Sequence, residues 1–384
     1  MPAGGRTVKK KLRVGVIFGG RSGEHEVSLM SAESVISAMN PEKFDVVPIG
    51  ISKEGRWLVG PDALPKLKQS AIEGRPPGLI PSAFIADPAT PGLIALEKES
   101  APVPDGHLQQ ESFDVIFPVL HGPYGEDGTV QGLFELGDVP YVGCGVAASA
   151  VGMDKALMKL VFQAAGLPVL DWIQVNRGWV DTRYEEIAEE VARRLGYPCF
   201  VKPANLGSSV GVSRVDDPGS LRPALLEAAK YDRKILVEKA AVGCREVECA
   251  VLGNDDPQVS VPGEIVSSGA FYDYRAKYID GKSELVIPAR ISEAAAAKVR
   301  EMSRRAFLAI DGAGLARVDF FVHAETEEIW VNEINTMPGF TRFSMYPKLW
   351  EATGIPYPEL IERLIELALE RHAEKRRSRV TYEG

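Results

Sequence analysis

The sequence has few of the features that mark secreted, membrane-spanning or nucleic-acid-binding proteins. Only four of its 384 residues are cysteines, they form no C-x-x-C pair and no secretory leader precedes them, so we expect reduced thiols in a cytoplasmic protein. No apolar run approaches the ~20 residues that a membrane-spanning helix needs. With a net charge of −9, the chain also lacks the basic surface that displaces counterions from nucleic acids or anionic membranes. Any polyanionic ligand must therefore be held by a few placed cations.

Two common nucleotide-binding fingerprints are missing as well. The glycine turn at residues 19–23 does not have the G-x-G-x-x-G spacing, and no acidic residue ends a second strand at the expected place. Both absences count against an NAD-binding oxidoreductase. A second glycine loop, at residues 202–211, lacks the helix and the G-K-[ST] ending of a P-loop. Its small hydroxylated residues still suit a flap over phosphates, although a plain hairpin turn explains its glycines equally well.

The most informative feature that is present is a predicted antiparallel hairpin near the C-terminus. Large apolar residues recur at every second position in two segments, 317–322 and 329–335, and a short polar segment joins them. The apolar positions that we assign to the core are Val318, Phe320, Val322, Trp330 and Ile334. The alternate positions form a second face for polar side chains.

The polar face of this hairpin carries opposed acids. Folding the hairpin symmetrically about Thr326 sets Asp319 opposite Glu333 and Arg317 opposite Asn335. Facing carboxylates repel each other, so the arrangement is stable when positive charge lies between them. Hard oxygen ligands of this kind suit Mg²⁺, which proteins usually share with substrate phosphates. A solvated acidic face, with Arg317 as a surface counter-ion, is the alternative interpretation.

The rest of the pattern predicts an α/β protein. A strand at 12–18, a glycine turn and a helix at 26–39 open a parallel α/β domain, with a Pro- and Gly-rich elaboration at about 60–112. Further strands are predicted at 44–51, 115–120, 169–174, 199–202 and 235–238, and further helices at 154–165, 184–195, 293–310 and 357–371. No internal repeat or low-complexity tract is present.

Several isolated charges suit an anionic or amine-bearing ligand. Lys202 lies on the strand beneath the second glycine loop, and Lys155 lies in the first turn of a helix, where a bound anion or an Asp154 cap would offset its repulsion from the helix dipole. Glu24, at the start of the first helix, either receives a cationic amine or merely complements the dipole. Residues 272–278 combine three tyrosines with two cations, which fits a closing lid or an amphipathic edge strand.

Taken together, these segments resemble the D-alanine–D-alanine ligases of the ATP-grasp superfamily. The motifs that carry the resemblance are Gly-Glu-His-Glu-Val-Ser at 23–28, His-Gly-Pro-Tyr-Gly-Glu-Asp-Gly at 121–128, Met-Asp-Lys at 153–155, the 202–211 loop, the 272–278 segment and Asn-Glu-Ile-Asn-Thr-Met-Pro-Gly at 332–339. The resemblance runs from about Leu12 to the final helix, with no departure at a position that the family uses for chemistry.

The resemblance implies an ATP-grasp fold of three domains, α/β with α+β character in the C-terminal part. We expect an N-terminal Rossmann-like domain at 1–143 that carries the insertion, a small central subdomain at 144–238 and a C-terminal subdomain at 239–384 with the metal site and lid. The family joins two D-alanine molecules into D-alanyl-D-alanine for peptidoglycan synthesis and converts ATP to ADP and phosphate. An acyl phosphate forms first, and the second amine then attacks it. The resemblance also implies two Mg²⁺ ions, with Mn²⁺ as an alternative, and a cytoplasmic homodimer.

The resemblance further assigns roles to individual residues. The implied metal ligands are Asp319, Glu333 and Asn335. The implied ATP ligands are Lys155, Lys202, Ser208, Ser209, Glu238, Lys239, Ala241, Glu246 and Lys277. The implied D-alanine contacts are Glu24 for the first ammonium, His121 beside it, Ser344 for the second carboxylate, and Arg317 with the Gly339 N–H for the oxyanion. Ser208 is expected to connect Glu24 to Tyr278 and so close the loop and lid over the acyl phosphate.

The sequence leaves two alternative functions for a protein of this fold. A D-alanine–D-lactate ligase would make an ester, but such family members differ in the lid, so Tyr278 within an intact Tyr-x-Ala-Lys-Tyr favours the dipeptide. A catalytically idle nucleotide-binding protein would be favoured by the loss of a hairpin acid or of Arg317, and none of these is lost.

Overall fold

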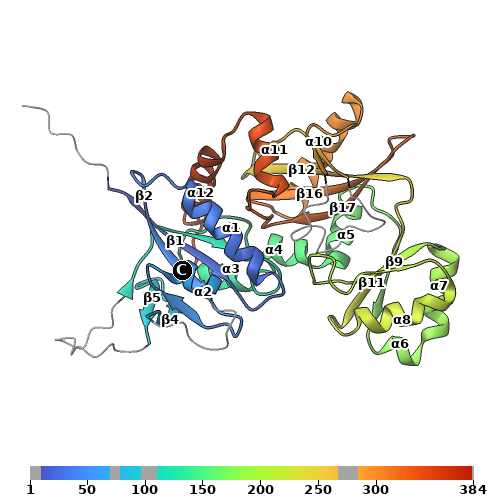
Figure 1. Cartoon of the computed structure of the whole chain (residues 1–384), viewed down its shortest axis with the longest axis horizontal. Helices are drawn as coiled ribbons and strands as arrows, with labels where there is room; N and C mark the ends of the chain where they lie inside the picture. The colour runs from blue at the N-terminus through green and yellow to red at the C-terminus, as the bar shows by residue number, and fades with distance from the viewer. Residues whose placement is uncertain (1–9, 70–77, 97–109, 267–283, 383–384) are drawn as a thin grey trace, which may run out of the picture.

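The computed structural model of the protein describes residues 10–69, 78–96, 110–266 and 284–382. Strands of these residues form three sheets, one at one end of the molecule and two at the other end (Figure 1). The α/β class expected from the sequence is confirmed. Within the described ranges, every helix is too short or too polar to cross a bilayer.

The first sheet contains the predicted parallel α/β unit. β1 (Leu12–Gly19) pairs in parallel with β2 (Phe44–Ile51) and with β7 (Val115–Val119), while α1 (His25–Ala38) connects β1 to β2. β1 is buried on both faces from Val14 onward, as expected for a parallel strand between two layers. Its last residue leads into the glycine turn and then into α1, so Glu24 lies at the carboxyl edge of this sheet.

The insertion at about 60–112 extends this first sheet. Its described elements, with the strand that precedes it, are β3 (Trp57–Val59), α2 (Ala63–Gln69), β4 (Ile80–Ile85), β5 (Gly92–Ala95) and β6 (Gln110–Glu111). The strands pair antiparallel in the order β6-β5-β4-β3-β2 and so widen the sheet at its β2 edge. The described residues of the insertion pack into the cores on the two faces of this sheet, as the sequence indicated, but their strand pairing was not predicted.

The second sheet is small and antiparallel. Its strands, in the order β10-β9-β11-β8, are β8 (Trp172–Asn176), β9 (Cys199–Pro203), β10 (Ser213–Val215) and β11 (Lys234–Lys239). One face packs on α6 (Trp179–Thr182), α7 (Tyr184–Arg194) and α8 (Pro218–Ala228). Because side chains alternate along a strand, Lys202 and Glu238 project from the opposite face. The strand predicted at 169–174 begins later, at Trp172.

The third sheet is antiparallel and carries the predicted hairpin. Its strands are β12 (Cys244–Gly253), β13 (Gln258–Val259), β14 (Gly263–Val266), β15 (Glu284–Val286), β16 (Gly314–His323) and β17 (Ile329–Asn335). One face packs on α4 (Val146–Met153), α5 (Lys155–Ala164) and α10 (Glu293–Ala309). Asp154 caps α5 by accepting the Ala156 and Leu157 N–H groups, which confirms the cap weighed from the sequence.

The register of the hairpin agrees with the prediction at its polar end and departs from it at the other. Arg317 lies opposite Asn335, and Asp319 lies opposite Glu333. The pairing then shifts by one residue, so that Phe320 faces Val331 and Asn332 is the extra residue of a β-bulge. The assignment of Trp330 to the core was therefore wrong. Ile329 and Val331 are buried in its place, and Trp330 is half-buried on the opposite face.

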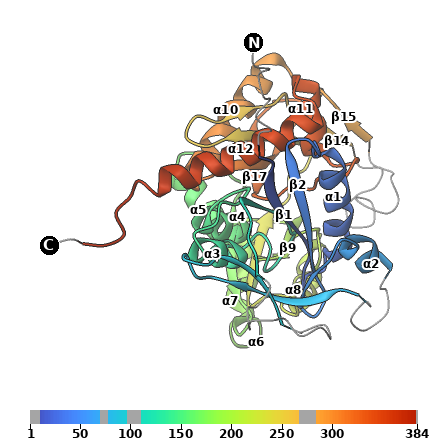
Figure 2. The ribbon, with the colours of Figure 1, turned by 90° about the vertical axis from the view of Figure 1, so that its left-hand side faces the viewer.

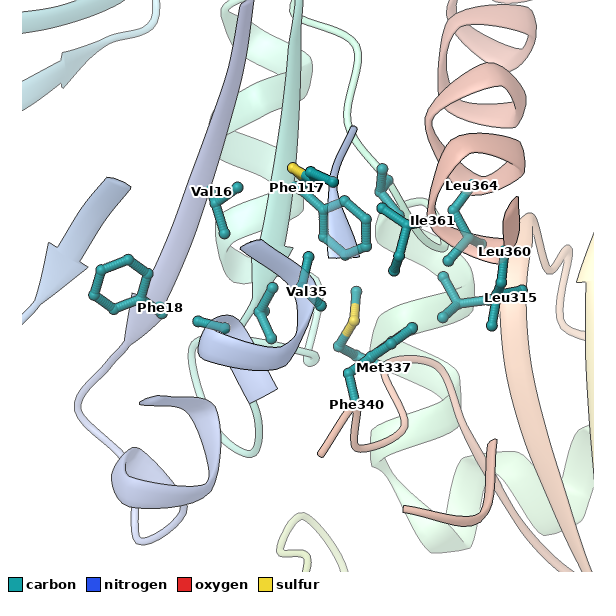
Figure 3. Packing of buried hydrophobic residues seen from close by; sticks show 14 of the residues in the cluster. Val16, Phe18, Val35, Phe117, Leu315, Met337, Phe340, Leu360, Ile361 and Leu364 are labelled. Atoms are coloured by element: carbon teal, nitrogen blue, oxygen red, sulfur yellow. The ribbon is translucent and has the colours of Figure 1, made fainter. Parts of the chain in front are cut away.

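A large apolar core joins the first sheet to the third. α11 (Met345–Thr353) and α12 (Tyr357–Lys375) pack in it, with α12 beside α1 (Figure 2). α3 (Thr129–Leu136) lies against the other face of the first sheet. Phe340 is fully buried here, with its ring centroid 6.0 Å from that of Phe117 and 5.5 Å from that of Tyr346 (Figure 3). The core thus fixes the loop that follows β17 against the first sheet.

Replacing Phe340 with alanine should destabilise the protein by about 3–5 kcal/mol, because a large buried ring is lost and its neighbours relax only partly. Leu136→Ala is the control, since that side chain is 68% exposed and its truncation should change the free energy of unfolding by no more than about 0.5 kcal/mol. Urea denaturation of both variants and of the wild type measures the difference. Equal losses in the two variants would contradict the role assigned to Phe340.

Candidate active site

Two adjoining cavities lie where the three sheets approach one another. The first has a volume of about 110 Å³ and the second of about 400 Å³. Among the residues assigned to D-alanine, the first is lined by Glu24, His121, Arg317, Gly339 and Ser344. Among those assigned to ATP, the second is lined by Lys155, Lys202, Ser208, Ser209, Glu238, Lys239, Ala241 and Glu246. Lys155, Ser208 and Glu333 line both cavities, so the two meet at these residues. Lys277 and Tyr278 lie outside the described residues.

The second glycine loop contacts the first helix above the smaller cavity. The Ser208 hydroxyl donates a hydrogen bond to the Glu24 carboxylate. At Gly207, an added Cβ would lie 3.0 Å from a Glu24 carboxylate oxygen, so a larger residue would crowd this approach. Ser208 itself has a φ of +52°, a backbone conformation that residues other than glycine rarely adopt. The expected link between Ser208 and Glu24 is therefore present.

His121 connects the first helix to the loop after β17. Its Nδ1 lies 3.1 Å from the Met337 carbonyl oxygen, and its Nε2 lies 3.1 Å from the Ser31 hydroxyl. Burial lowers the pKa of the imidazole, although the nearby Glu24 carboxylate opposes this effect. A neutral ring that donates to the carbonyl and accepts from the serine satisfies both contacts. His121 thus supports the wall of the first cavity.

Glu126 was not singled out from the sequence, although its motif was. Its carboxylate accepts a hydrogen bond of 2.7 Å from the Gly122 N–H and lines the first cavity. Burial, reinforced by the negative charge of Glu24, raises its pKa to about 8. Glu126 therefore carries a proton at neutral pH in this arrangement.

The polar face of the third sheet carries acids on three neighbouring strands. Glu248 on β12 lies opposite Asp319, which lies opposite Glu333. Arg317 pairs with both Asp319 oxygens, at 2.7 and 2.6 Å, and with Glu248 at 3.0 Å. Burial opposes the charge on Arg317, but the two acids raise its pKa above the ordinary value. Glu248 was not singled out from the sequence, because its alternation with Glu246 along β12 is also what a half-exposed strand shows.

The positions of Asp319, Glu333 and Asn335 fit the predicted metal site only in part. Among the described residues, no group of three or more histidine, cysteine, aspartate or glutamate side chains could enclose a metal ion. Asp319 lines neither cavity, accepts a further bond of 3.0 Å from the Asn335 amide and is 9% exposed. Glu333 and Asn335 do face the first cavity. Mg²⁺ is commonly held by one or two carboxylates together with substrate phosphates, so these donors suit a site that a phosphate ligand completes.

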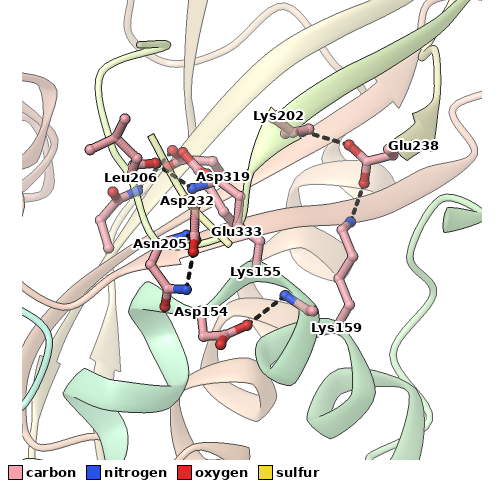
Figure 4. Close-up of polar contacts among 12 residues, drawn as sticks. Asp154, Lys155, Lys159, Lys202, Asn205, Leu206, Asp232, Glu238, Asp319 and Glu333 are labelled. Atoms are coloured by element: carbon pink, nitrogen blue, oxygen red, sulfur yellow. Dashed lines mark hydrogen bonds and ion pairs between the residues drawn. The ribbon is translucent and has the colours of Figure 1, made fainter. Parts of the chain in front are cut away.

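Cations approach the second cavity from two elements. The Lys155 ammonium donates to the Leu206 carbonyl oxygen at 2.8 Å and lies 3.7 Å from Glu333. Lys202 lies 2.6 Å from one carboxylate oxygen of Glu238, and Lys159 contacts the other oxygen (Figure 4). Burial disfavours the Glu238 charge, but the two lysines lower its pKa. Lys159 was not singled out from the sequence, because it lies among the apolar positions of α5.

Comparison with known proteins agrees with this geometry. The family models described as D-ala D-ala ligase N-terminus and D-ala D-ala ligase C-terminus match residues 13–144 and 161–366. A D-alanine–D-alanine ligase of Heliobacterium modesticaldum is 52% identical over 96% of this chain and 97% of its own length. One of Geobacillus kaustophilus is 50% identical over 97% of this chain and 98% of its own length.

Solved structures give the same result. The D-alanine–D-alanine ligase of Coxiella burnetii has a TM-score of 0.80 and 36% identity, covering 96% of this chain and 97% of its own. The chain belongs to the D-alanine–D-alanine ligase family. The VanG D-Ala:D-Ser ligase of Enterococcus faecalis also has a TM-score of 0.80, with 34% identity, covering 94% of this chain and all of its own.

Membership in the D-alanine–D-alanine ligase family confirms the resemblance and the ATP-grasp fold inferred from the sequence. It also agrees with the evidence against an NAD-binding oxidoreductase. Use of ATP follows from the family, and the second cavity, with Lys155 and Lys202 on its wall, can accommodate an anionic ligand. The glycine loop at 202–211 connects strand β9 to strand β10, whereas the dinucleotide and P-loop motifs connect a strand to a helix, which accounts for the absence of both motifs.

Glu126 should make the stability of this ligase depend on pH. Its pKa rises from 4.5 when unfolded to about 8 when folded, so the folded protein holds the extra proton and loses stability as the pH rises between these values. Relative to Glu126→Gln, the wild type should lose several kcal/mol across this window, because each pKa unit corresponds to about 1.4 kcal/mol. Urea denaturation at several pH values measures both proteins. Parallel pH profiles would show that Glu126 is ionised in the folded protein.

Proposed function

We propose that the protein ligates two molecules of D-alanine to D-alanyl-D-alanine with consumption of ATP. The reaction would proceed through an acyl phosphate and supply a precursor of peptidoglycan. One observation carries the proposal: the acid suited to an amine and the cations suited to phosphates line two cavities that meet at Lys155, Ser208 and Glu333. A carboxylate in the smaller cavity can thereby face a terminal phosphate that enters from the larger one.

The smaller cavity would bind both amino acids. Glu24 accepts the ammonium of the first D-alanine, and His121 supports the wall beside it. Arg317, held by Glu248 and Asp319, points its charge at the carbonyl oxygen on which negative charge develops. The Gly339 N–H is the second donor. An added Cβ on Gly339 would lie only 2.7 Å from the Ser344 hydroxyl, which explains the glycine beside the residue assigned to the second carboxylate.

The larger cavity would bind ATP. Lys155 and Lys202 contact phosphate oxygens, and Lys277 of the lid segment joins them. Ser208 and Ser209 cover the phosphates, while the adenosine contacts are Glu238, Lys239, Ala241 and Glu246. Two Mg²⁺ ions, or Mn²⁺ in their place, would bind Asp319, Glu333 and Asn335 and neutralise phosphate charge. Side chains alternate along β17, so Glu333 and Asn335 line the smaller cavity while Ile334 between them stays buried.

Exclusion of water is the main task of the loop. An acyl phosphate that met water before the second amine would hydrolyse, so the contact between Ser208 and Glu24 closes one side of the cavity. Tyr278 is proposed to complete this closure from the lid. The chemistry itself needs no protein nucleophile, since positioning and charge neutralisation supply most of the acceleration in phosphoryl transfer.

The second substrate separates this proposal from its alternatives. The family includes a D-Ala:D-Ser ligase by name, and a D-alanine–D-lactate ligase was considered from the sequence. Relatives at 50% identity or more are named as D-alanine–D-alanine ligases, which favours the dipeptide. We also propose that the protein is a cytoplasmic homodimer. We further propose three domains, at 1–143, 144–238 and 239–384, in which residues 144–170 of the second domain pack on the third sheet.

Purified protein supplied with ATP, Mg²⁺ and D-alanine should release phosphate and D-alanyl-D-alanine in equal amounts. L-alanine should react poorly, because a site built for one stereoisomer does not align the amine and carboxylate of the other. Mass spectrometry of the products and a phosphate assay measure both outcomes. Phosphate release without dipeptide would refute the proposed ligation, and a product formed only with D-lactate or D-serine would reassign the second substrate.

Replacing Asp319 with asparagine or Glu333 with glutamine should reduce kcat by a factor on the order of 100 or more, since each change removes a charge proposed to hold the metal. Glu325→Gln is the matched control, because this acid lies exposed in the connection of the same hairpin. Dipeptide formation at saturating Mg²⁺ measures the effect, and thermal melting verifies folding. Full activity in the folded Asp319 and Glu333 variants would exclude both as metal ligands.

A further inference from the structure

One buried cation beside the ATP cavity has no part in the function proposed above. The Lys159 side chain is 1% exposed and lines neither cavity. It reaches from α5 to the Glu238 carboxylate on β11, which is 2% exposed. A lysine is rarely buried this completely, because removing its charge from water is costly unless a charged partner compensates. The role of Lys159 should therefore lie in its pairing with Glu238.

Glu238 is shared between two lysines that differ in exposure. One carboxylate oxygen contacts the ammonium of Lys159, and the other lies 2.6 Å from that of Lys202 (Figure 4). The Lys202 side chain is 13% exposed and lines the ATP cavity. The acid thus has one partner enclosed in the protein and one partner at the wall of a ligand site.

This sharing matters when a nucleotide binds. Lys202 can contact a phosphate oxygen or an adenine nitrogen only if it gives up part of its contact with Glu238. A buried carboxylate that loses its only counter-charge is strongly destabilised. With a second lysine in place, Glu238 keeps one ion pair while Lys202 turns toward the ligand.

We propose that Lys159 is a positioning residue that balances the charge of Glu238 and so frees Lys202 for the nucleotide. The inference rests on the proposed role of Lys202 in ATP binding. Burial lowers the pKa of Lys159, and the attraction of Glu238 acts in the opposite direction. When Lys202 leaves, Lys159 becomes the main counter-charge of Glu238, which favours its charged form. The nucleotide therefore binds without leaving an unpaired acid behind.

The variant Lys159→Met tests this role. Methionine fills a similar volume, and Glu238 retains Lys202 in the ligand-free protein, so the fold should persist. Lys202 would then be the only partner of Glu238, and calorimetry with ADP and Mg²⁺ should show binding weaker by about 10- to 100-fold. In steady-state kinetics the KM for ATP should rise while the KM for D-alanine stays unchanged. A purely structural defect would not separate the two substrates in this way.

A double variant tests the electrostatic reason. Adding Glu238→Gln to Lys159→Met removes the acid that retains Lys202 and keeps the backbone of β11. Measured against Glu238→Gln alone, the added Lys159→Met change should therefore cost little or no further ADP affinity. The matched control is Lys234→Met, which breaks another poorly exposed lysine pair, with Asp154 at the start of α5, outside both cavities. It should lower the melting temperature and leave ADP affinity unchanged.

Three results would overturn the inference. Wild-type ADP affinity in Lys159→Met would show that Glu238 needs no second cation. An equal loss of ADP affinity from Lys159→Met in the wild-type and Glu238→Gln backgrounds would show that Lys159 acts through packing. Weakened binding in Lys234→Met to the same degree would show that any loss of a buried pair near α5 suffices. Failure of the wild type itself to bind ADP would instead refute the proposed nucleotide site, and this inference with it.

Discussion

Close approach of carboxylates is the constraint on which the site depends. Glu248, Asp319 and Glu333 lie side by side on three strands, and their repulsion is offset by Arg317 and Lys155. These two cations of the protein therefore offset part of the negative charge of the three acids. A ligand that brings phosphates and divalent cations replaces some of these contacts with its own, so binding is an exchange of partners. Such an exchange keeps nearly every buried charge paired, which a low-dielectric site requires.

The apolar core makes this arrangement of charges possible. The opposed acids lie on one sheet and Glu24 on another, so the two must be held in register. Phe340 packs against Phe117 from the first sheet, and the Met337 carbonyl oxygen lies 3.1 Å from Nδ1 of the His121 imidazole. These contacts flank Gly339 in sequence. Packing and polar contacts thus hold one loop in place, and that loop presents its backbone to the smaller cavity.

Local pattern predicted much of this protein. The helix starting at Glu293 and the strand pair that sets Asp319 opposite Glu333 follow from period and turn signals, and both are confirmed. The bulge at Asn332 could not be predicted, because the alternation of Trp330 and Ile334 fits a regular strand as well. The pairing of the insertion with β2 was also beyond local pattern, since strand partners distant in sequence leave no periodic trace.

The sequence by itself determined the fold class, the family and the set of charged residues suited to an amine and a phosphate, because periodicity and spaced motifs are properties of the chain. Only the tertiary structure decided which charges pair. Glu126, Lys159 and Glu248 were not assigned a role from the sequence, because the neighbours that give them one lie far along the chain. Burial and Coulomb attraction depend on distances in space, and these distances exist only once the three sheets have packed together.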